Sequence, residues 1–157
     1  MVMTMTRDDF LTSFMDEALA LAEDAAKAGE VPVAAIITDA DGQVVARATN
    51  RVERDGDPTA HAEILAIRDA SVALGSTRLD GCDLWVTLEP CPMCAGAIAH
   101  ARIRRLYYGA EDPKSGGVSH GPRVFSHPTC HHRPEVYSGL SEDRAGQLLT
   151  SFFKSKR

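Results

Sequence analysis

The alternation of apolar and polar positions along the chain predicts helices and strands in regular succession. Between residues 8 and 28 the apolar positions recur every three or four residues, which predicts an amphipathic helix that ends at Gly29. Residues 31–38 are rich in β-branched side chains and predict a strand. The turn sequence at 39–42 then returns the chain as a second strand over 43–49.

The middle of the chain predicts two helices that begin close to chemically active residues. A cap residue and a proline precede a helix expected from about residue 59 to 74. A short apolar strand at 83–88, a helix at 91–101 and a strand at 103–108 form one β-α-β unit with a parallel strand pair. The remaining elements expected are a long irregular connection at 109–132, a short strand at 136–138 and a helix at 141–154.

These elements predict an α/β fold in which a mixed sheet of about five strands lies between helices. The chain has 157 residues, which is a usual length for one domain with a sizeable core, so we expect a single domain over residues 1–157. No linker, repeat or low-complexity segment interrupts the pattern.

Composition excludes several classes of protein. No apolar run approaches the roughly 20 residues of a membrane span, and residues 1–10 lack the pattern of a secretory signal. Two of the four cysteines form a Cys-x-x-Cys motif, which favours metal binding in a reducing compartment over a disulfide framework. We therefore expect a cytoplasmic protein.

Charge is distributed unevenly along the chain. The net charge of −5 argues against indiscriminate binding of nucleic acid. Up to Ala99 there are 7 Lys and Arg against 17 Asp and Glu, whereas from His100 onward there are 10 against 5. The basic last third fits a local anionic partner and fits equally well a solvated surface without one.

The candidate chemistry lies in two short segments about thirty residues apart. Cys91 and Cys94 are three positions apart, so they share one face of the predicted helix, at an N-terminus whose dipole favours thiolates. His61 would complete a Cys2His set and leave the fourth position of a tetrahedral zinc open to water, as in catalytic sites. Glu63, close to His61, is then the candidate proton carrier.

Other cysteines and histidines allow different interpretations. Cys82 could act as a fourth ligand, which would make the zinc structural. A second metal could be held by the run Cys130-His131-His132, although this run lacks a recognised ligand spacing. His100 is better explained as a cation at the end of its helix than as a ligand.

These motifs resemble the signature of the zinc-dependent nucleobase deaminases, in which a His-x-Glu is followed by Pro-Cys-x-x-Cys. Longer segments resemble the bacterial tRNA-specific adenosine deaminases in particular, from about residue 10 to the last residue. They are Glu30-Val31-Pro32-Val33, residues 57–64, residues 87–98, residues 108–116 and Phe152-Phe153-Lys154.

The resemblance implies a cytidine-deaminase-like three-layer α/β/α sandwich and hydrolytic deamination of the wobble adenosine of a tRNA anticodon loop to inosine. It implies one zinc ion on His61, Cys91 and Cys94 that activates water, with Glu63 moving the protons. In an ideal helix, side chains two positions apart project about 200° apart. Spacing alone therefore does not bring His61 and Glu63 to one site, and the resemblance supplies that step.

The resemblance also implies contacts with RNA. Asn50 matches an asparagine that binds the flipped-out base, and Lys114 matches a lysine near the RNA backbone. Phe153 and Arg157 match residues that contact the anticodon loop, a usual combination for unstacked bases. Each has a plain alternative, since Asn50 suits a turn, Lys114 a solvated surface, and Phe153 a core. The resemblance further implies a homodimer, and the segment 117–133, with Arg123, differs from the corresponding segment of many relatives.

Three functions are therefore distinguished. The first is a tRNA adenosine deaminase, which the basic last third, Phe153 and Arg157 favour. The second is a deaminase of guanine, cytosine or a free nucleoside with the same zinc and the same Glu63. The third is a zinc-stabilised binding module without catalysis, in which Glu63 would be an ordinary surface residue.

Overall fold

The computed structural model describes residues 7–156, and its side chains from Phe14 onward. Five strands form one mixed sheet in the order β2-β1-β3-β4-β5. Their bounds are β1 (Ala34–Thr38), β2 (Val44–Thr49), β3 (Asp83–Leu88), β4 (Arg105–Ala110) and β5 (Glu135–Tyr137). β1 is antiparallel to both of its neighbours, whereas β3, β4 and β5 run parallel. The predicted mixed sheet of five strands is confirmed.

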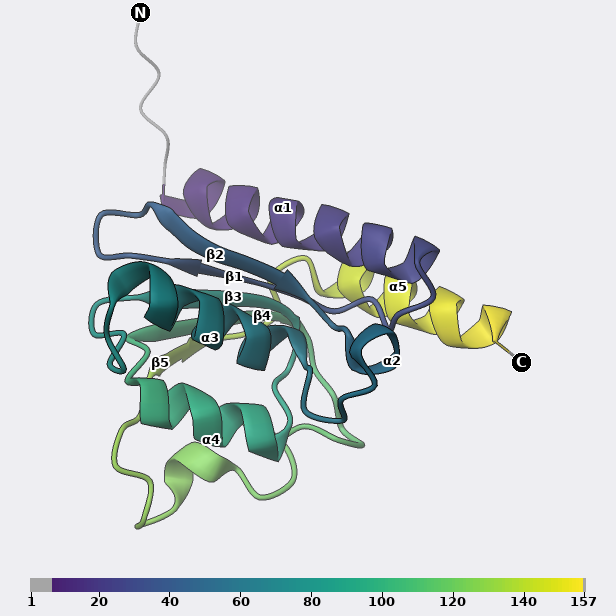
Figure 1. Cartoon of the computed structure of the whole chain (residues 1–157). Coiled ribbons are helices and arrows are strands. Elements are labelled where there is room, and N and C mark those ends of the chain that lie inside the picture. Colours follow the sequence, from purple (N-terminus) through teal and green to yellow (C-terminus); the bar gives the residue numbers. More distant parts are fainter. Residues whose placement is uncertain (1–6, 157) are drawn as a thin grey trace, which may run out of the picture.

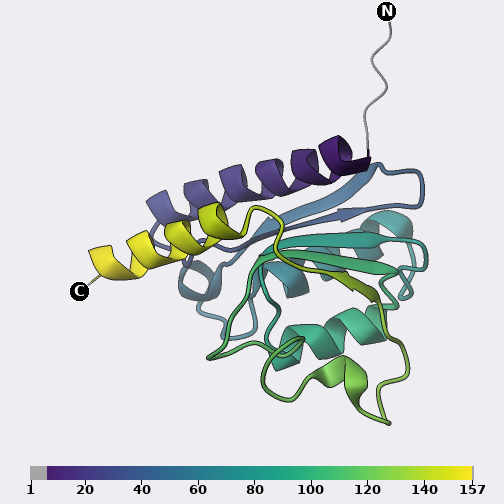
Figure 2. The same cartoon turned by 180° about the vertical axis from the view of Figure 1, so that it is seen from behind.

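Helices cover both faces of the sheet (Figures 1 and 2). The long helices α1 (Arg7–Lys27) and α5 (Glu142–Ser155) pack on one face, and α3 (Ala62–Leu74) and α4 (Pro92–Ala101) lie on the other. This is the three-layer α/β/α arrangement that the resemblance implied. Within the described range no helix has both the length and the apolar character of a membrane span.

The strands alternate between two hydrophobic cores, as the period of two along a β-strand requires. In β1, Ile36 points to the core beneath α1 and α5, whereas Ile37 points to the core beneath α3 and α4. Trp85 of β3 belongs to the first core, where its ring stacks on Tyr107 with centroids 4.0 Å apart. Both faces of the central strands are therefore buried, which holds the site-bearing helices on a rigid sheet.

The chain between β2 and α3 differs from the expectation. A short helix, α2 (Val52–Asp55), forms where the sequence analysis placed no helix, and α3 begins at Ala62 rather than near residue 59. The cause is local, because the Oδ1 atom of Asp57 accepts hydrogen bonds from the backbone N–H and the hydroxyl of Thr59, both at 2.8 Å. This turn competes with a helix and delays its start until His61.

Candidate metal centre and active site

Three ligand atoms meet at the N-termini of two adjacent helices. His61 is the N-cap of α3 and Cys91 is the N-cap of α4, both with extended backbone, and Cys94 lies in the first turn of α4. The Nδ1 atom of His61 lies 3.6 Å from Sγ of Cys91 and 3.5 Å from Sγ of Cys94. Pro92 occupies the first position of α4, as a proline at a helix start should.

This donor set fits a zinc ion. Zinc–sulfur bonds of about 2.3 Å and zinc–nitrogen bonds of about 2.0–2.1 Å, at tetrahedral angles, place sulfur and nitrogen about 3.6 Å apart. The distances from His61 to the two cysteines have that value. Across the described residues, His61, Cys91 and Cys94 make up the one group of potential ligand atoms that converge in this way. Three protein ligands leave one tetrahedral position for a reacting molecule.

The two thiols have opposite electrostatic environments. The pKa of Cys91 is lowered to about 5, first because the Cys94 side chain donates a hydrogen bond to it, and further by the backbone N–H of Cys94 and by His61. The pKa of Cys94 is raised by the same hydrogen bond, by burial and by the carboxylate of Glu63. Two thiolates and a carboxylate this close together repel one another, so a divalent cation is the natural partner of the set.

Glu63 lies beside this group and is 4% exposed. Because His61 is an N-cap with ψ of 150° rather than a helical residue, the 200° separation expected within a helix does not apply, and both side chains line one pocket. Burial is the main cause that raises the pKa of Glu63, and hydrogen bonds from its own backbone and from Cys94 oppose it. A raised pKa suits a carboxyl that takes up and returns protons near neutral pH.

A pocket of about 260 Å³ opens in front of the group. That volume lies just below the usual range for drug-sized ligands and suits a smaller molecule such as a single nucleobase. Its wall combines apolar side chains with polar groups from four separate segments of the chain. The lining residues are Val31, Val33, Asn50, Val52, Glu53, His61, Ala62, Glu63, Leu88, Glu89, Cys91, Asp112 and Ser115.

Asn50 lines this pocket and is held by a residue that the sequence analysis did not single out. Its Nδ2 atom donates to Oε2 of Glu30 at 3.2 Å, and both side chains are buried. Glu30 also accepts the backbone N–H of Arg54 at 2.6 Å and pairs with its guanidinium at 3.6 Å. The carboxylate therefore joins α2 to Asn50 and orients the amide. The position of Glu30, an acidic residue directly before the predicted strand 31–38, was the signal that could have identified this residue.

Of the residues predicted to contact RNA, Asn50 lines this pocket, whereas Lys114 and Phe153 do not. Lys114 is exposed on the loop that supplies Asp112 and Ser115. Phe153 on α5 is 50% exposed, and its neighbour Phe152 is half-buried with a ring centroid 5.4 Å away. Near the end of α5, the amine of Lys156 lies close to Gly29, the residue before Glu30. Arg157 lies outside the described residues.

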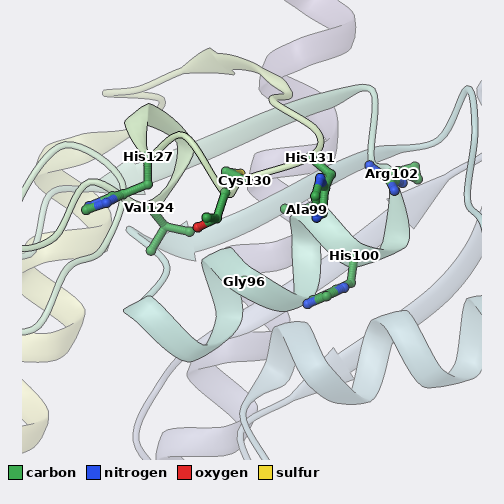
Figure 3. A pocket seen from close by; sticks show the side chains of 9 residues that line it. Gly96, Ala99, His100, Arg102, Val124, His127, Cys130 and His131 are labelled. Carbon is green, nitrogen blue, oxygen red and sulfur yellow. The ribbon is translucent and has the colours of Figure 1, made fainter.

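The remaining histidines and cysteines do not form a second metal site in the described part of the chain. Cys130 donates to the carbonyl oxygen of His132, and the rings of His132 and His127 bond the carbonyl oxygens of Ile103 and Pro122. Two of these contacts lie within the connection 111–134, and the contact with Ile103 ties it to the segment that follows α4. Figure 3 shows a pocket lined by residues of this connection and of the end of α4. Cys82 lies in the core at the start of β3 and does not join the zinc ligands.

Comparison with known proteins identifies the class to which this fold and site belong. The family model of the cytidine and deoxycytidylate deaminase zinc-binding region matches residues 9–110, which include all three proposed ligands and Glu63. The chain belongs to this family of zinc-dependent deaminases. The predicted zinc cofactor is confirmed, because the family model describes a zinc-binding region and the three predicted ligand residues lie together.

Within the family, the chain is similar over nearly its whole length to tRNA-specific adenosine deaminases. That of Agrobacterium fabrum is 57% identical over 146 residues, covering 93% of this chain and 95% of the relative. A solved structure from work on A-to-I editing by tRNA:A34 deaminases superposes with a TM-score of 0.86 at 57% identity, covering 88% of this chain and 99% of its own. A guanine deaminase of Nitrosomonas europaea is more distant, at 26% identity and a TM-score of 0.77, covering 96% and 86%. The predicted resemblance is confirmed.

Proposed function

We propose that this chain, as a single domain over residues 1–157, deaminates the wobble adenosine of a tRNA anticodon loop to inosine. The observation that carries the chemistry is the convergence of His61, Cys91 and Cys94 beside the buried Glu63, at the floor of a pocket that suits one base. Similarity at 57% identity to enzymes named tRNA-specific adenosine deaminase supports the choice of substrate. Water adds to carbon 6 of adenine, the bond to the amino nitrogen breaks, and ammonia leaves.

The zinc ion, when held by these three residues, acts as a Lewis acid that activates a water molecule for attack. Glu63 would accept the proton of the attacking water, because its buried carboxylate lies beside Cys94. It then protonates the ring nitrogen next to carbon 6 and afterwards the departing amino group. Asn50, oriented by Glu30, is placed to hydrogen-bond an edge of the base. The apolar side chains Val31, Val33 and Leu88 exclude bulk water around it.

Several features support RNA as the carrier of the base. The pocket opens beside the loop with Lys114, and Phe153 near the end of α5 is half exposed. An exposed aromatic ring with nearby cations holds unstacked bases of single-stranded loops. The alternative is deamination of a free base such as guanine, which the more distant structural relative supports less strongly.

We also propose that two copies associate through the outer faces of α3 and α4, and that the protein acts in the cytoplasm, where tRNA is found. Val72 of α3 is 84% exposed, and Ile64 and Ile67 of the same helix are only half-buried. Gly96 and Ala97 give α4 a flat outward side, which allows close approach of a second helix pair. Light scattering coupled to size-exclusion chromatography gives the mass of the particle. A monomer at micromolar concentration would contradict the dimer.

The test of the proposed activity is single-turnover conversion of adenosine to inosine in an anticodon stem-loop RNA. Free adenine, adenosine, guanine and cytosine are assayed in parallel, and zinc content is measured in each preparation. Inosine at the wobble position alone supports the proposal. Turnover of a free base with the RNA untouched would indicate the small-molecule deaminase. Bound zinc without turnover of any substrate would leave only the binding module.

A further inference from the structure

A buried carboxylate next to the metal ligands takes part in neither zinc binding nor the proton transfers described above. Glu89 directly follows β3 and lies two residues before Cys91 in the sequence. Its side chain is buried, with 2% of the residue exposed. Its Oε1 atom accepts the backbone N–H of Asp112 at 3.1 Å and the Nδ1–H of His120 at 2.7 Å. Its Oε2 atom accepts three successive backbone N–H groups at 3.0–3.2 Å, those of Val118, Ser119 and His120. All five donors belong to one loop, residues 112–120.

This loop, which we call the clamp loop, forms one wall of the pocket. Asp112 and Ser115 line the pocket opposite His61 and Glu63. The Oδ1 atom of Asp112 accepts the backbone N–H groups of Lys114 and Ser115 at 3.2 and 3.0 Å, which gives the loop tip a defined shape. Within the described structure the loop contains no helix or strand, so its position depends on these hydrogen bonds.

Two glycines let the clamp loop approach closely enough to reach the carboxylate. A Cβ atom at Gly116 would lie 2.3 Å from Oε2 of Glu89, and one at Gly117 would lie 2.5 Å from the nitrogen of Pro92. The backbone N–H of Gly117 also donates to the carbonyl oxygen of Pro90 at 2.8 Å. The loop therefore packs directly on Glu89 and on the first turn of α4, with no room for side chains between them.

We propose that Glu89 is a positioning residue that holds the clamp loop against the start of α4 and so sets the place of Asp112, Lys114 and Ser115 for the incoming RNA strand. Hydrogen bonds from backbone N–H groups to an ionised carboxylate are stronger than those to a neutral acceptor. The five donors of the loop therefore compensate for the burial of the Glu89 carboxylate. A glutamine has the same shape, but its NH2 group cannot accept hydrogen bonds. Glu89→Gln would therefore lose those hydrogen bonds from the loop that the replaced oxygen accepts. The inference rests on the proposed function, because the loop is taken to face RNA.

The decisive variant is Glu89→Gln, assayed with the anticodon stem-loop and by hydrogen exchange of the free protein. We expect zinc content to stay at the wild-type level and the amides of residues 118–120 to exchange faster. We expect kcat/KM to fall about 10- to 100-fold, mostly through KM, since misplacing positioning groups by about 1 Å has effects of that size. His120→Ala, which removes one donor of five, should lie between wild type and Glu89→Gln.

A second pair of variants approaches the same contact from the loop. Gly116→Ala leaves Glu89 and the zinc ligands in place and pushes the loop away from the carboxylate, whereas Gly146→Ala on α5 places a methyl group where no atom lies within 4 Å. Gly116→Ala should reproduce the rise in KM and the faster exchange, and Gly146→Ala should reproduce neither. The comparison remains informative if Glu89→Gln folds poorly.

Two outcomes would overturn the inference. Unchanged exchange of residues 118–120 together with unchanged KM in Glu89→Gln would show that Glu89 does not hold the loop. Loss of zinc in step with loss of activity, without a separate effect on KM, would show that it supports the metal helix instead. If the wild-type protein does not act on the RNA, the proposed function fails, whereas hydrogen exchange still tests the clamp by itself.

Discussion

The Nδ1 atom of His61 lies 3.5 Å from the Sγ atom of Cys94, although 33 residues separate them in the chain. Neither residue is in the interior of a helix. His61 caps α3 and Cys94 lies in the first turn of α4, so the positive ends of two helix dipoles face the ligand atoms. These dipoles act in favour of thiolate ligands, although in the absence of a cation the pKa of Cys94 is raised by Cys91, by burial and by Glu63.

Removal of one thiol should therefore remove the metal. We expect Cys91→Ser and Cys94→Ser to lose the single zinc ion and all deaminase activity, because a hydroxyl is a poor substitute for a thiolate ligand. Cys130→Ser is the matched control, since the Cys130 thiol bonds only a carbonyl oxygen in the connection 111–134. Elemental analysis of the purified variants measures zinc per chain. Full zinc in Cys91→Ser would contradict the assigned ligands.

Glu63→Gln should separate catalysis from metal binding. The amide keeps the volume of the carboxyl but cannot carry protons, so we expect zinc to be retained and kcat to fall about 10²- to 10⁴-fold. Asp69→Asn on the same helix is the control, because its side chain is exposed to solvent. The rate of inosine formation under single-turnover conditions is the measurement. Activity of Glu63→Gln within a few-fold of wild type would exclude the proton-carrier role.

The two adjacent phenylalanines of α5 should respond differently to truncation. Phe153→Ala removes a ring that is half exposed, so the melting temperature should change little. Base–aromatic stacking contributes about 1–3 kcal/mol per base, which predicts a rise in KM for the stem-loop of about tenfold or more. Phe152→Ala should instead lower the melting temperature, because Phe152 is the more buried of the pair. Equal effects of both variants on KM would argue against a specific stack at Phe153.

A glycine in β4 should be intolerant of any side chain for steric reasons alone. A Cβ atom at Gly109 would lie 2.7 Å from the carbonyl oxygen of Thr87 and 3.1 Å from Cβ of Ala145. We expect Gly109→Ala to lower the free energy of unfolding by about 1–3 kcal/mol, the usual cost of overpacking. Gly146→Ala, in the open, should be neutral or stabilise by up to about 1 kcal/mol as a helix interior position. Urea denaturation of both variants provides the comparison.

The carboxylate of Glu89 predicts a pH dependence of stability. Burial by itself would raise the pKa of this carboxyl, but hydrogen bonds from the His120 ring and from backbone N–H groups of the clamp loop hold it below the usual value of 4.5. A group with a depressed pKa in the folded state stabilises above the pKa of the unfolded state and loses that contribution as the pH falls through the folded value.

The stability difference between wild type and Glu89→Gln should therefore be constant near neutral pH and shrink below about pH 4.5. Thermal unfolding of both proteins is measured at each pH, and the two stabilities are subtracted. Any effect of zinc release in acid is common to both proteins and cancels in this difference. A difference that stays constant down to pH 3 would show that folding does not lower the pKa of Glu89.

Local patterns in the sequence determined much of this protein. The period of apolar residues located α1, α5 and the central strands, because burial of one face repeats at short intervals. The spacing of Cys91 and Cys94 beside a proline that opens a helix indicated a zinc site, since few other chemistries use that combination.

Only the tertiary structure decided how the site is assembled. The Asp57–Thr59 turn moves the start of α3 to His61, and this brings His61 and Glu63 to one place, which the geometry of a continuous helix would forbid. The bond from Asn50 to Glu30 spans 20 residues, and those from the clamp loop to Glu89 span 23 to 31. The local periodicity of apolar residues does not predict such contacts. They depend on how distant segments pack and on which buried polar groups then need hydrogen-bond partners.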